Sequence, residues 1–130
     1  MVRRKIWRLL MRIQQVADKT GLSSHTLRYY EKLGLLHGIE RDSRGYRCFR
    51  DKDVTWVELI KRLKATKMPL AEIKRFAQLR VRGDCTIAER LDILYSHRQR
   101  VERQIEELHA HRSKIEEKIA LCERGGPLSR

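Results

Sequence analysis

The chain has 130 residues, enough for one modest domain with an appendage but too few for two full domains. Its 30 Lys and Arg residues exceed its 17 Asp and Glu residues, and this net charge of +13 favours a polyanionic partner, nucleic acid ahead of a membrane surface. No apolar run approaches the roughly 20 residues of a membrane span, and three cysteines, an odd number, indicate reduced thiols in a cytoplasmic protein.

Residues 1–10 are basic and amphipathic, but their apolar stretch is too short for a secretory signal. We expect a poorly ordered N-terminal extension here, either a basic arm or an addition upstream of a second start at Met11. Residues 11–82 are then expected to form the first domain, and residues 124–130 a C-terminal tail.

Two short helices joined by a tight turn are predicted between Met11 and Gly34. The first ends at Gly21, where a helix C-terminus favours a left-handed residue, and Ser23 or Ser24 offers a cap for the second. This spacing is typical of a helix-turn-helix. Leu27 and Tyr30 are predicted to face inward, which leaves a polar, cationic and aromatic surface formed by His25, Arg28 and Tyr29.

A short hairpin is predicted next, with a turn at residues 42–45. Tyr46 and Cys48 are expected on one face of its second strand, and Arg47 and Phe49 on the other. Arginines recur along the hairpin at positions Arg41, Arg44, Arg47 and Arg50. A wing of this charge beside a helix-turn-helix is typical of contact with a DNA backbone, and a solvated basic loop is the alternative.

Two more helices follow the hairpin. Asp51 or Asp53 is expected to cap the third, whose inward stripe consists of Val54, Val57, Ile60 and Leu63, with Trp56 at the rim of the core. Pro69 is expected to open the fourth, with Leu70, Ile73 and Phe76 facing inward. The chain then breaks at residues 82–84.

A long helix over residues 85–123 carries a coiled-coil pattern. Apolar residues alternate at spacings of four and three from Ile87 to Cys122, and only Arg98 and Arg112 interrupt them. One helix cannot bury such a seam by itself, so the sequence predicts a dimerisation helix. An antiparallel pair can set Ile87 against Ile119 of the partner subunit and Val101 against the partner's Ile105. The expected fold is therefore mainly α: a winged helix-turn-helix followed by a long helix that forms an antiparallel coiled-coil dimer.

These features together resemble the MerR family of bacterial transcription regulators. The resemblance covers about residues 11–122 and depends most on IQQVADKTGLSSHTLRYYEKLGLL at 13–36 and on RGYR at 44–47. It implies a cytoplasmic, nucleoid-associated homodimer on a palindromic promoter element whose spacer is too long. A response to an effector or stress signal would distort that spacer so that bacterial RNA polymerase can engage.

The resemblance also implies DNA contacts by position. Ser24 and His25 match residues that reach base edges, and Lys64 matches a backbone contact. The remaining expected contacts lie on the second helix and the wing, and they are Arg28, Tyr29, Tyr30, Arg41, Arg44, Tyr46 and Arg47. Tyr30 reads as inward-facing as well, so its ring is expected to pack while its hydroxyl reaches out.

Cys85 and Cys122 are the candidates for an effector or thiol-sensing site. They partly match the cysteines of metal-sensing branches, but residues 123–130 lack a further cysteine, so a metal site would be incomplete and no cofactor is expected. Residues 82–91 are closer to the branch that responds to aldehydes and thiol stress. That branch places its sensing cysteine in the third helix, where this chain has Arg62.

Two other classes of function are alternatives to a regulator. An enzyme is not expected, because no Ser-His-Asp set, phosphate loop or zinc motif is present. A non-specific architectural protein that binds nucleic acid without an effector would account for the charge. It would not account for a helix-turn-helix combined with a dimer seam.

Overall fold

A computed structural model describes residues 10–125, which divide between Ile93 and Leu94 into two compact units. The extension expected over 1–10 and the tail expected over 124–130 lie almost wholly outside the described residues. No helix among residues 10–125 is long and apolar enough to cross a membrane. The elements in chain order are α2 (Ile13–Thr20), α3 (Ser24–Lys32), β1 (Glu40–Arg41), β2 (Arg47–Cys48), α4 (Asp51–Ala65), α5 (Leu70–Arg82), the 3-10 turn η1 (Asp84–Thr86) and α6 (Ile87–Glu123).

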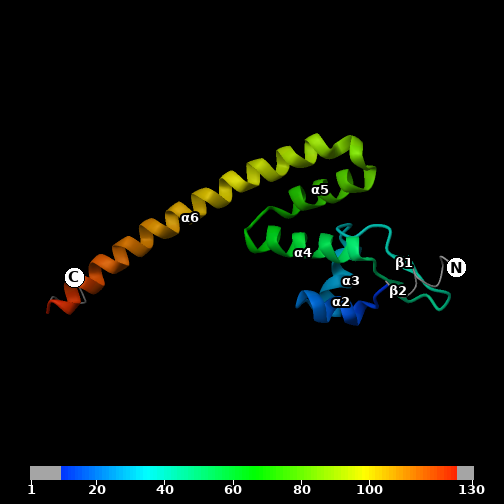
Figure 1. Cartoon of the computed structure of the whole chain (residues 1–130), viewed down its shortest axis with the longest axis horizontal. Helices are drawn as coiled ribbons and strands as arrows, with labels where there is room; N and C mark the ends of the chain where they lie inside the picture. Colours follow the sequence, from blue (N-terminus) through cyan, green and yellow to red (C-terminus); the bar gives the residue numbers. More distant parts are fainter. Residues whose placement is uncertain (1–9, 126–130) are drawn as a thin grey trace. The chain divides into compact units, whose positions relative to one another are not determined.

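The helix-turn-helix is formed by α2 and α3, which pack against each other in the first unit (Figure 1). The helix α2 ends at Gly21, whose φ of 75° lies in the left-handed region that strains any residue with a side chain. Ser23 caps α3, because its hydroxyl accepts the amide of Thr26 at 3.0 Å. Leu27 and Tyr30 are buried, as predicted, so the opposite side of α3 faces outward.

The wing consists of β1 and β2, paired antiparallel with Glu40 opposite Cys48 and Arg41 opposite Arg47. Its turn is closed by the amide of Asp42, which donates to the carbonyl of Tyr46 at 2.9 Å. The hairpin and its turn at residues 42–45 are therefore where the sequence predicts them.

The predicted alternation of faces along the second wing strand is wrong. Cys48 and Phe49 are neighbours and both are buried, whereas Tyr46 is 59% exposed. The physical reason is that β2 is only two residues long. Phe49 instead pairs with Met11, each amide donating to the other's carbonyl at 2.8 Å, so the chain turns before a longer strand could alternate.

The helices α4 and α5 lie side by side and hold the core of the first unit (Figure 1). The stripe of Val54, Val57, Ile60 and Leu63 is buried, as predicted. Trp56 lies inside the core and not at its rim, since it is 4% exposed. Its indole N–H donates to the carbonyl of Leu35 at 2.7 Å, and its ring stacks on Phe76 with centroids 5.3 Å apart.

The starts of both helices differ from the prediction. Arg50 is the N-cap residue of α4, and Asp53 reaches back to accept its amide at 2.9 Å, so neither aspartate is the cap itself. Pro69 is the N-cap residue of α5. Leu70 is 40% exposed and does not face inward, because it is the first residue of the helix and lies at the edge of the packed face.

The chain turns into α6 through Gly83 and η1. Gly83 has φ 93° and ψ −161°, a conformation that a residue with Cβ avoids. The hydroxyl of Thr86 donates to the carbonyl of Leu79 at 2.6 Å, which ties η1 to the last turns of α5. A continuous helix then runs from Ile87 to Glu123.

The second unit begins at Leu94, within α6. In this unit four apolar positions of the predicted seam are exposed, namely Ile105 (47%), Leu108 (66%), Ile115 (60%) and Ile119 (50%), and the other three, Leu94, Val101 and Cys122, are partly exposed. The two arginines that interrupt the seam each lie near a glutamate one turn on, Arg98 with Glu102 at 3.8 Å and Arg112 with Glu116 at 3.7 Å. The mainly helical winged fold with a long C-terminal helix is confirmed, and the pairing of two such helices stays a prediction.

Candidate nucleic-acid interface

The outward side of α3 presents three of the predicted contact residues. His25, Arg28 and Tyr29 are exposed there, and Tyr29 is half exposed at 50%. Ser24 is partly covered, because its hydroxyl donates to Oε1 of Gln14 on α2 at 3.1 Å. These imidazole, guanidinium and phenol groups can form hydrogen bonds in a groove of DNA, and the guanidinium also offers a positive charge to the phosphates.

Tyr30 on α3 and Lys64 on α4 contact each other. The Tyr30 ring is 4% exposed, and the ammonium nitrogen of Lys64 lies 5.0 Å from its centroid, within the range of a cation–π contact. Tyr30 therefore packs as a core residue. Lys64 is exposed on α4.

Three of the wing arginines, Arg41, Arg47 and Arg50, form ion pairs with carboxylates. Glu31 of α3 accepts from two of them, Arg47 through Nη2 at 2.9 Å and Arg41 through Nη2 at 3.3 Å. Arg50 pairs with Glu40 across the hairpin. Arg41, Arg44 and Tyr46 are exposed, while the Arg47 side chain is only 22% exposed. Arg41 is thus both held by Glu31 and exposed to solvent.

A surface hollow of about 410 Å³ lies where the helix-turn-helix meets the wing. Four of the residues that line it are arginines, contributed by the start of α2, by α3 and by the wing, and the full lining is Arg12, Ile13, Gln14, Arg28, Arg44, Gly45, Tyr46 and Arg47. Four guanidinium groups around one hollow can offer hydrogen bonds to phosphate oxygens, which a planar guanidinium binds bidentately. We call this the arginine hollow.

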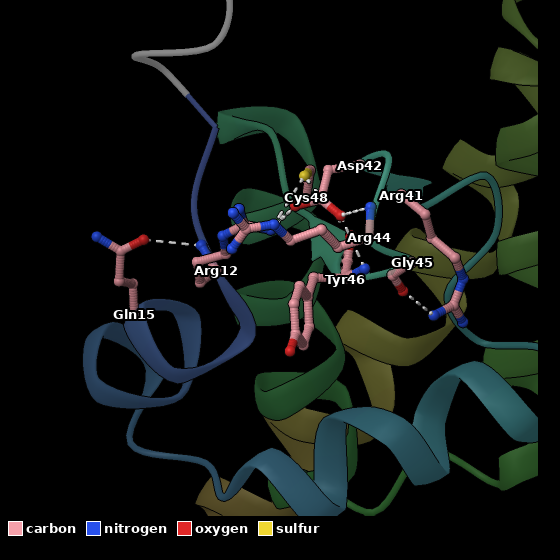
Figure 2. Close-up of polar contacts among 8 residues, drawn as sticks. All are labelled: Arg12, Gln15, Arg41, Asp42, Arg44, Gly45, Tyr46 and Cys48. Atoms are coloured by element: carbon pink, nitrogen blue, oxygen red, sulfur yellow. Dashed lines mark hydrogen bonds and ion pairs between the residues drawn. The ribbon is translucent and has the colours of Figure 1, made fainter.

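Arg12 is the one arginine lining the hollow that is not among the DNA contacts predicted from the sequence. Figure 2 shows it reaching from the start of α2 toward the wing turn, where its guanidinium meets Asp42 at 2.6 Å. The same guanidinium lies 5.6 Å from the centroid of the Tyr46 ring. Its backbone amide donates to Oε1 of Gln15 at 2.7 Å, which closes the first turn of α2. A lone basic residue just before a helix carries no distinctive pattern, so only the fold reveals its position.

Asp42 organises the wing turn electrostatically. Its carboxylate accepts the amides of Arg44 at 2.9 Å and Tyr46 at 3.0 Å in addition to the Arg12 guanidinium (Figure 2). Desolvation favours the neutral acid, but the hydrogen bonds from Arg12 and from these two amides outweigh it, so the pKa of Asp42 is lowered. The same hydrogen bond raises the pKa of Arg12. The pair is therefore charged, and it links α2 to the wing.

The three cysteines differ in their exposure, and none of them is among the residues that line the arginine hollow. Cys85 is exposed on η1, with its sulfur 3.7 Å from the carbonyl of Arg82. Cys122 is partly exposed near the end of α6, and Cys48 is buried under the wing. Arg62 carries a side chain that is 72% exposed and lies 3.5 Å from Glu58. Within residues 10–125, no group of three or more His, Cys, Asp or Glu side chains is arranged to hold a metal ion.

Comparison with known families matches the chain in two overlapping parts. Residues 11–79 match the family described as MerR HTH family regulatory protein, and residues 54–121 match the family described as MerR, DNA binding. Together the two matches cover the helix-turn-helix, the wing, α4, α5 and nearly all of α6.

Individual relatives agree with this match. An uncharacterized HTH-type transcriptional regulator of Haemophilus influenzae is 42% identical over 88% of this chain and 84% of its own length. The HTH-type transcriptional regulator AdhR of Bacillus subtilis is 36% identical over 70% of this chain and 65% of its own. These relatives are regulators and not enzymes.

A solved structure also resembles the fold. The crystal structure of HiNmlR, a MerR family regulator lacking the sensor domain and bound to promoter DNA, superposes with a TM-score of 0.80 at 41% identity. The match covers 88% of this chain and 91% of that one.

Proposed function

Because the chain belongs to the MerR family of helix-turn-helix transcriptional regulators, we propose that it acts as a homodimer on a palindromic promoter element. In this proposal the protein distorts an over-long promoter spacer in response to an effector or stress signal, and bacterial RNA polymerase then engages. In this proposal the protein acts on chromosomal DNA in the cytoplasm. The observation that carries the proposal is the arginine hollow between the helix-turn-helix and the wing.

Contacts to DNA are proposed for two groups of residues. His25, Arg28 and Tyr29 on the outer side of α3 would enter a groove, where Arg can bind guanine bidentately and position the helix. The wing and Arg12 would bind backbone phosphates on either side of the arginine hollow. Support for this division comes from the exposure of the first group and the clustering of cations in the second.

The homodimer is proposed from the second unit alone. Seam residues such as Leu108 and Ile115 are at least 60% exposed on α6, and the apolar spacing continues to Cys122. Burying apolar surface of this kind is worth about 25 cal/mol for each Å². A second copy of the helix supplies a matching surface, and a two-fold pair is what a palindromic DNA site requires.

Only the chemical class of the effector is proposed. Cys85 is an exposed thiol on the turn before α6, so a thiol-reactive signal is the version to test first. Arg62, which stands at the position of a sensing cysteine in the aldehyde-responsive branch, cannot serve as a thiol.

The proposal is tested by selection from a pool of random duplexes with the wild-type protein, followed by transcription of a promoter that carries the selected site. We expect an inverted repeat to be recovered and transcription by bacterial RNA polymerase to change when the protein is added. Recovery of duplexes without any common sequence would contradict the proposal and favour a non-specific architectural protein. An inverted repeat with no effect on transcription would overturn the regulatory part alone.

A further inference from the structure

One carboxylate joins α3 to both strands of the wing. Oε1 of Glu31 lies 2.9 Å from Nη2 and 3.0 Å from Nε of Arg47 on β2, and 3.3 Å from Nη2 of Arg41 on β1. The Glu31 side chain is only 24% exposed, so solvent weakens these contacts less than it weakens a fully exposed ion pair. A negative charge within a strongly basic surface is unfavourable for binding a polyanion. The presence of Glu31 there therefore needs an explanation other than attraction to DNA.

The geometry points to a positioning role. We propose that Glu31 determines the DNA specificity of the wing by fixing the guanidinium groups of Arg41 and Arg47 against α3. This rests on the proposed function, since it assumes that the wing binds DNA beside α3.

One guanidinium group has enough N–H donors to bind a carboxylate of the protein and a phosphate of DNA at the same time. Each arginine has five N–H donors. Arg47 uses two nitrogens on Glu31, and Arg41 divides two between Glu31 and the carbonyl of Gly45, the latter at 3.0 Å. The remaining donors are available to DNA, and they are held in place before binding, which lowers the entropy cost of the contact.

Loss of Glu31 therefore has two opposite effects on DNA binding. Removing the carboxylate makes the surface more positive, which strengthens attraction to any duplex, because non-specific binding is electrostatic. It also releases Arg41 and Arg47, so the wing no longer presents them at one distance from α3. Binding that depends on α3 and the wing fitting one sequence at once should weaken.

The test compares two duplexes and two charge-removing variants. The probes are a duplex selected from a random pool by the wild-type protein and a scrambled duplex of the same composition. For Glu31→Gln we expect affinity for the selected duplex to fall about tenfold, the range of a charge-assisted hydrogen bond, while affinity for the scrambled duplex rises. The control is Glu58→Gln, which removes an equal charge whose partner, Arg62, lies on the same helix. The control should not change the ratio of the two affinities by more than about twofold.

A further variant, at Arg47, leaves the net charge unchanged. Arg47→Lys retains the cation but cannot form the two-nitrogen contact that Arg47 makes with Glu31. We expect it to lower affinity for the selected duplex with no change for the scrambled one. Combined with Glu31→Gln, it should add little further loss, because both changes break the same contact.

Other outcomes would overturn the inference. If both affinities fall together in Glu31→Gln, the residue only supports the fold, and if both rise together, it only reduces the net charge. A wild-type protein that selects no duplex over the scrambled one would instead overturn the proposed function.

Discussion

At the scale of single residues, Arg28 connects the fold to DNA most directly. It is exposed on α3 and lines the arginine hollow together with residues of α2 and the wing. We expect Arg28→Ala to weaken binding to the selected duplex by about 1–3 kcal/mol, the usual range for a lost Arg contact. A salt titration measures this, with Arg103→Ala on α6 as a control of equal charge. Unchanged binding in Arg28→Ala would mean that the recognition surface lies elsewhere.

Arg47 is a less suitable probe of a direct DNA contact than Arg28, although the sequence predicts both residues as contacts. The Arg47→Ala change would remove a candidate phosphate contact and also the link from β2 to Glu31 at 2.9 Å. Any loss of binding in that variant has two causes. Arg28 avoids the ambiguity because it lies on the exposed side of α3.

The exposure of the cysteines orders their reactivity. Cys85 is exposed, Cys122 is partly exposed and Cys48 is buried. We expect a mild alkylating reagent to modify Cys85 first and Cys48 last, because reagent access limits the reaction. Peptide mapping by mass spectrometry over time measures the order. Normal induction of a Cys85→Ser protein by every thiol-reactive candidate would contradict a thiol sensor and favour a ligand that binds without a covalent bond.

At the scale of elements, the wing is fastened to the helix-turn-helix by ion pairs. The Arg12–Asp42 contact depends on the charge of Asp42, whose pKa is lowered in the folded state. Such a group stabilises the fold above the ordinary aspartate pKa of about 3.9, and this contribution is lost as the pH falls through the lower folded value. We expect Asp42→Asn to be less stable than wild type near neutral pH and the difference to shrink below about pH 4.

Urea unfolding of both proteins across this pH range measures the difference. Asp18→Asn is a suitable control, because Asp18 lies on α2 and its carboxylate accepts a hydrogen bond from the neutral side-chain amide of Gln14 at 3.0 Å. A difference between wild type and Asp42→Asn that grows as the pH falls would contradict the assigned role of Asp42.

The elements themselves could largely be predicted from the sequence, because their signals are local. Gly21 and Ser23 mark the turn by backbone conformation and capping, and the stripe from Val54 to Leu63 follows helical spacing. Trp56 was misplaced at the rim, because its position depends on the carbonyl of Leu35, 21 residues away in sequence. Local spacing carries no information about such a partner.

The candidate interface was predictable in part, for the same reason. The exposed face of α3 follows from helical periodicity once Leu27 and Tyr30 are placed inside. The links from Glu31 and Asp42 to arginines of other elements are not periodic, and they appear only when the wing is folded beside α3. The arginines of the wing can therefore be predicted from the sequence, but the carboxylates that hold them cannot.

At the scale of the whole molecule, the dimer is expected to be antiparallel. In that arrangement Cys85 of one subunit lies near Cys122 of the partner subunit, whereas a parallel pair brings like residues together. We expect mild oxidation of a Cys48→Ser variant to give a Cys85–Cys122 link between subunits, identified by mass spectrometry of the linked peptides. A dimer joined only through Cys122 to the partner's Cys122 would contradict the antiparallel register.

Footprinting by hydroxyl radicals on the selected duplex tests the central claim most directly, because it reports the symmetry and the surface of binding in one experiment. A two-fold dimer that binds through α3 and the wing should protect two equivalent segments, with centres one helical turn of about 10 base pairs, or a multiple of it, apart. Arg28→Ala should weaken the protection of both segments equally. A single protected segment, or uniform protection of the duplex, would contradict a two-fold promoter-binding regulator.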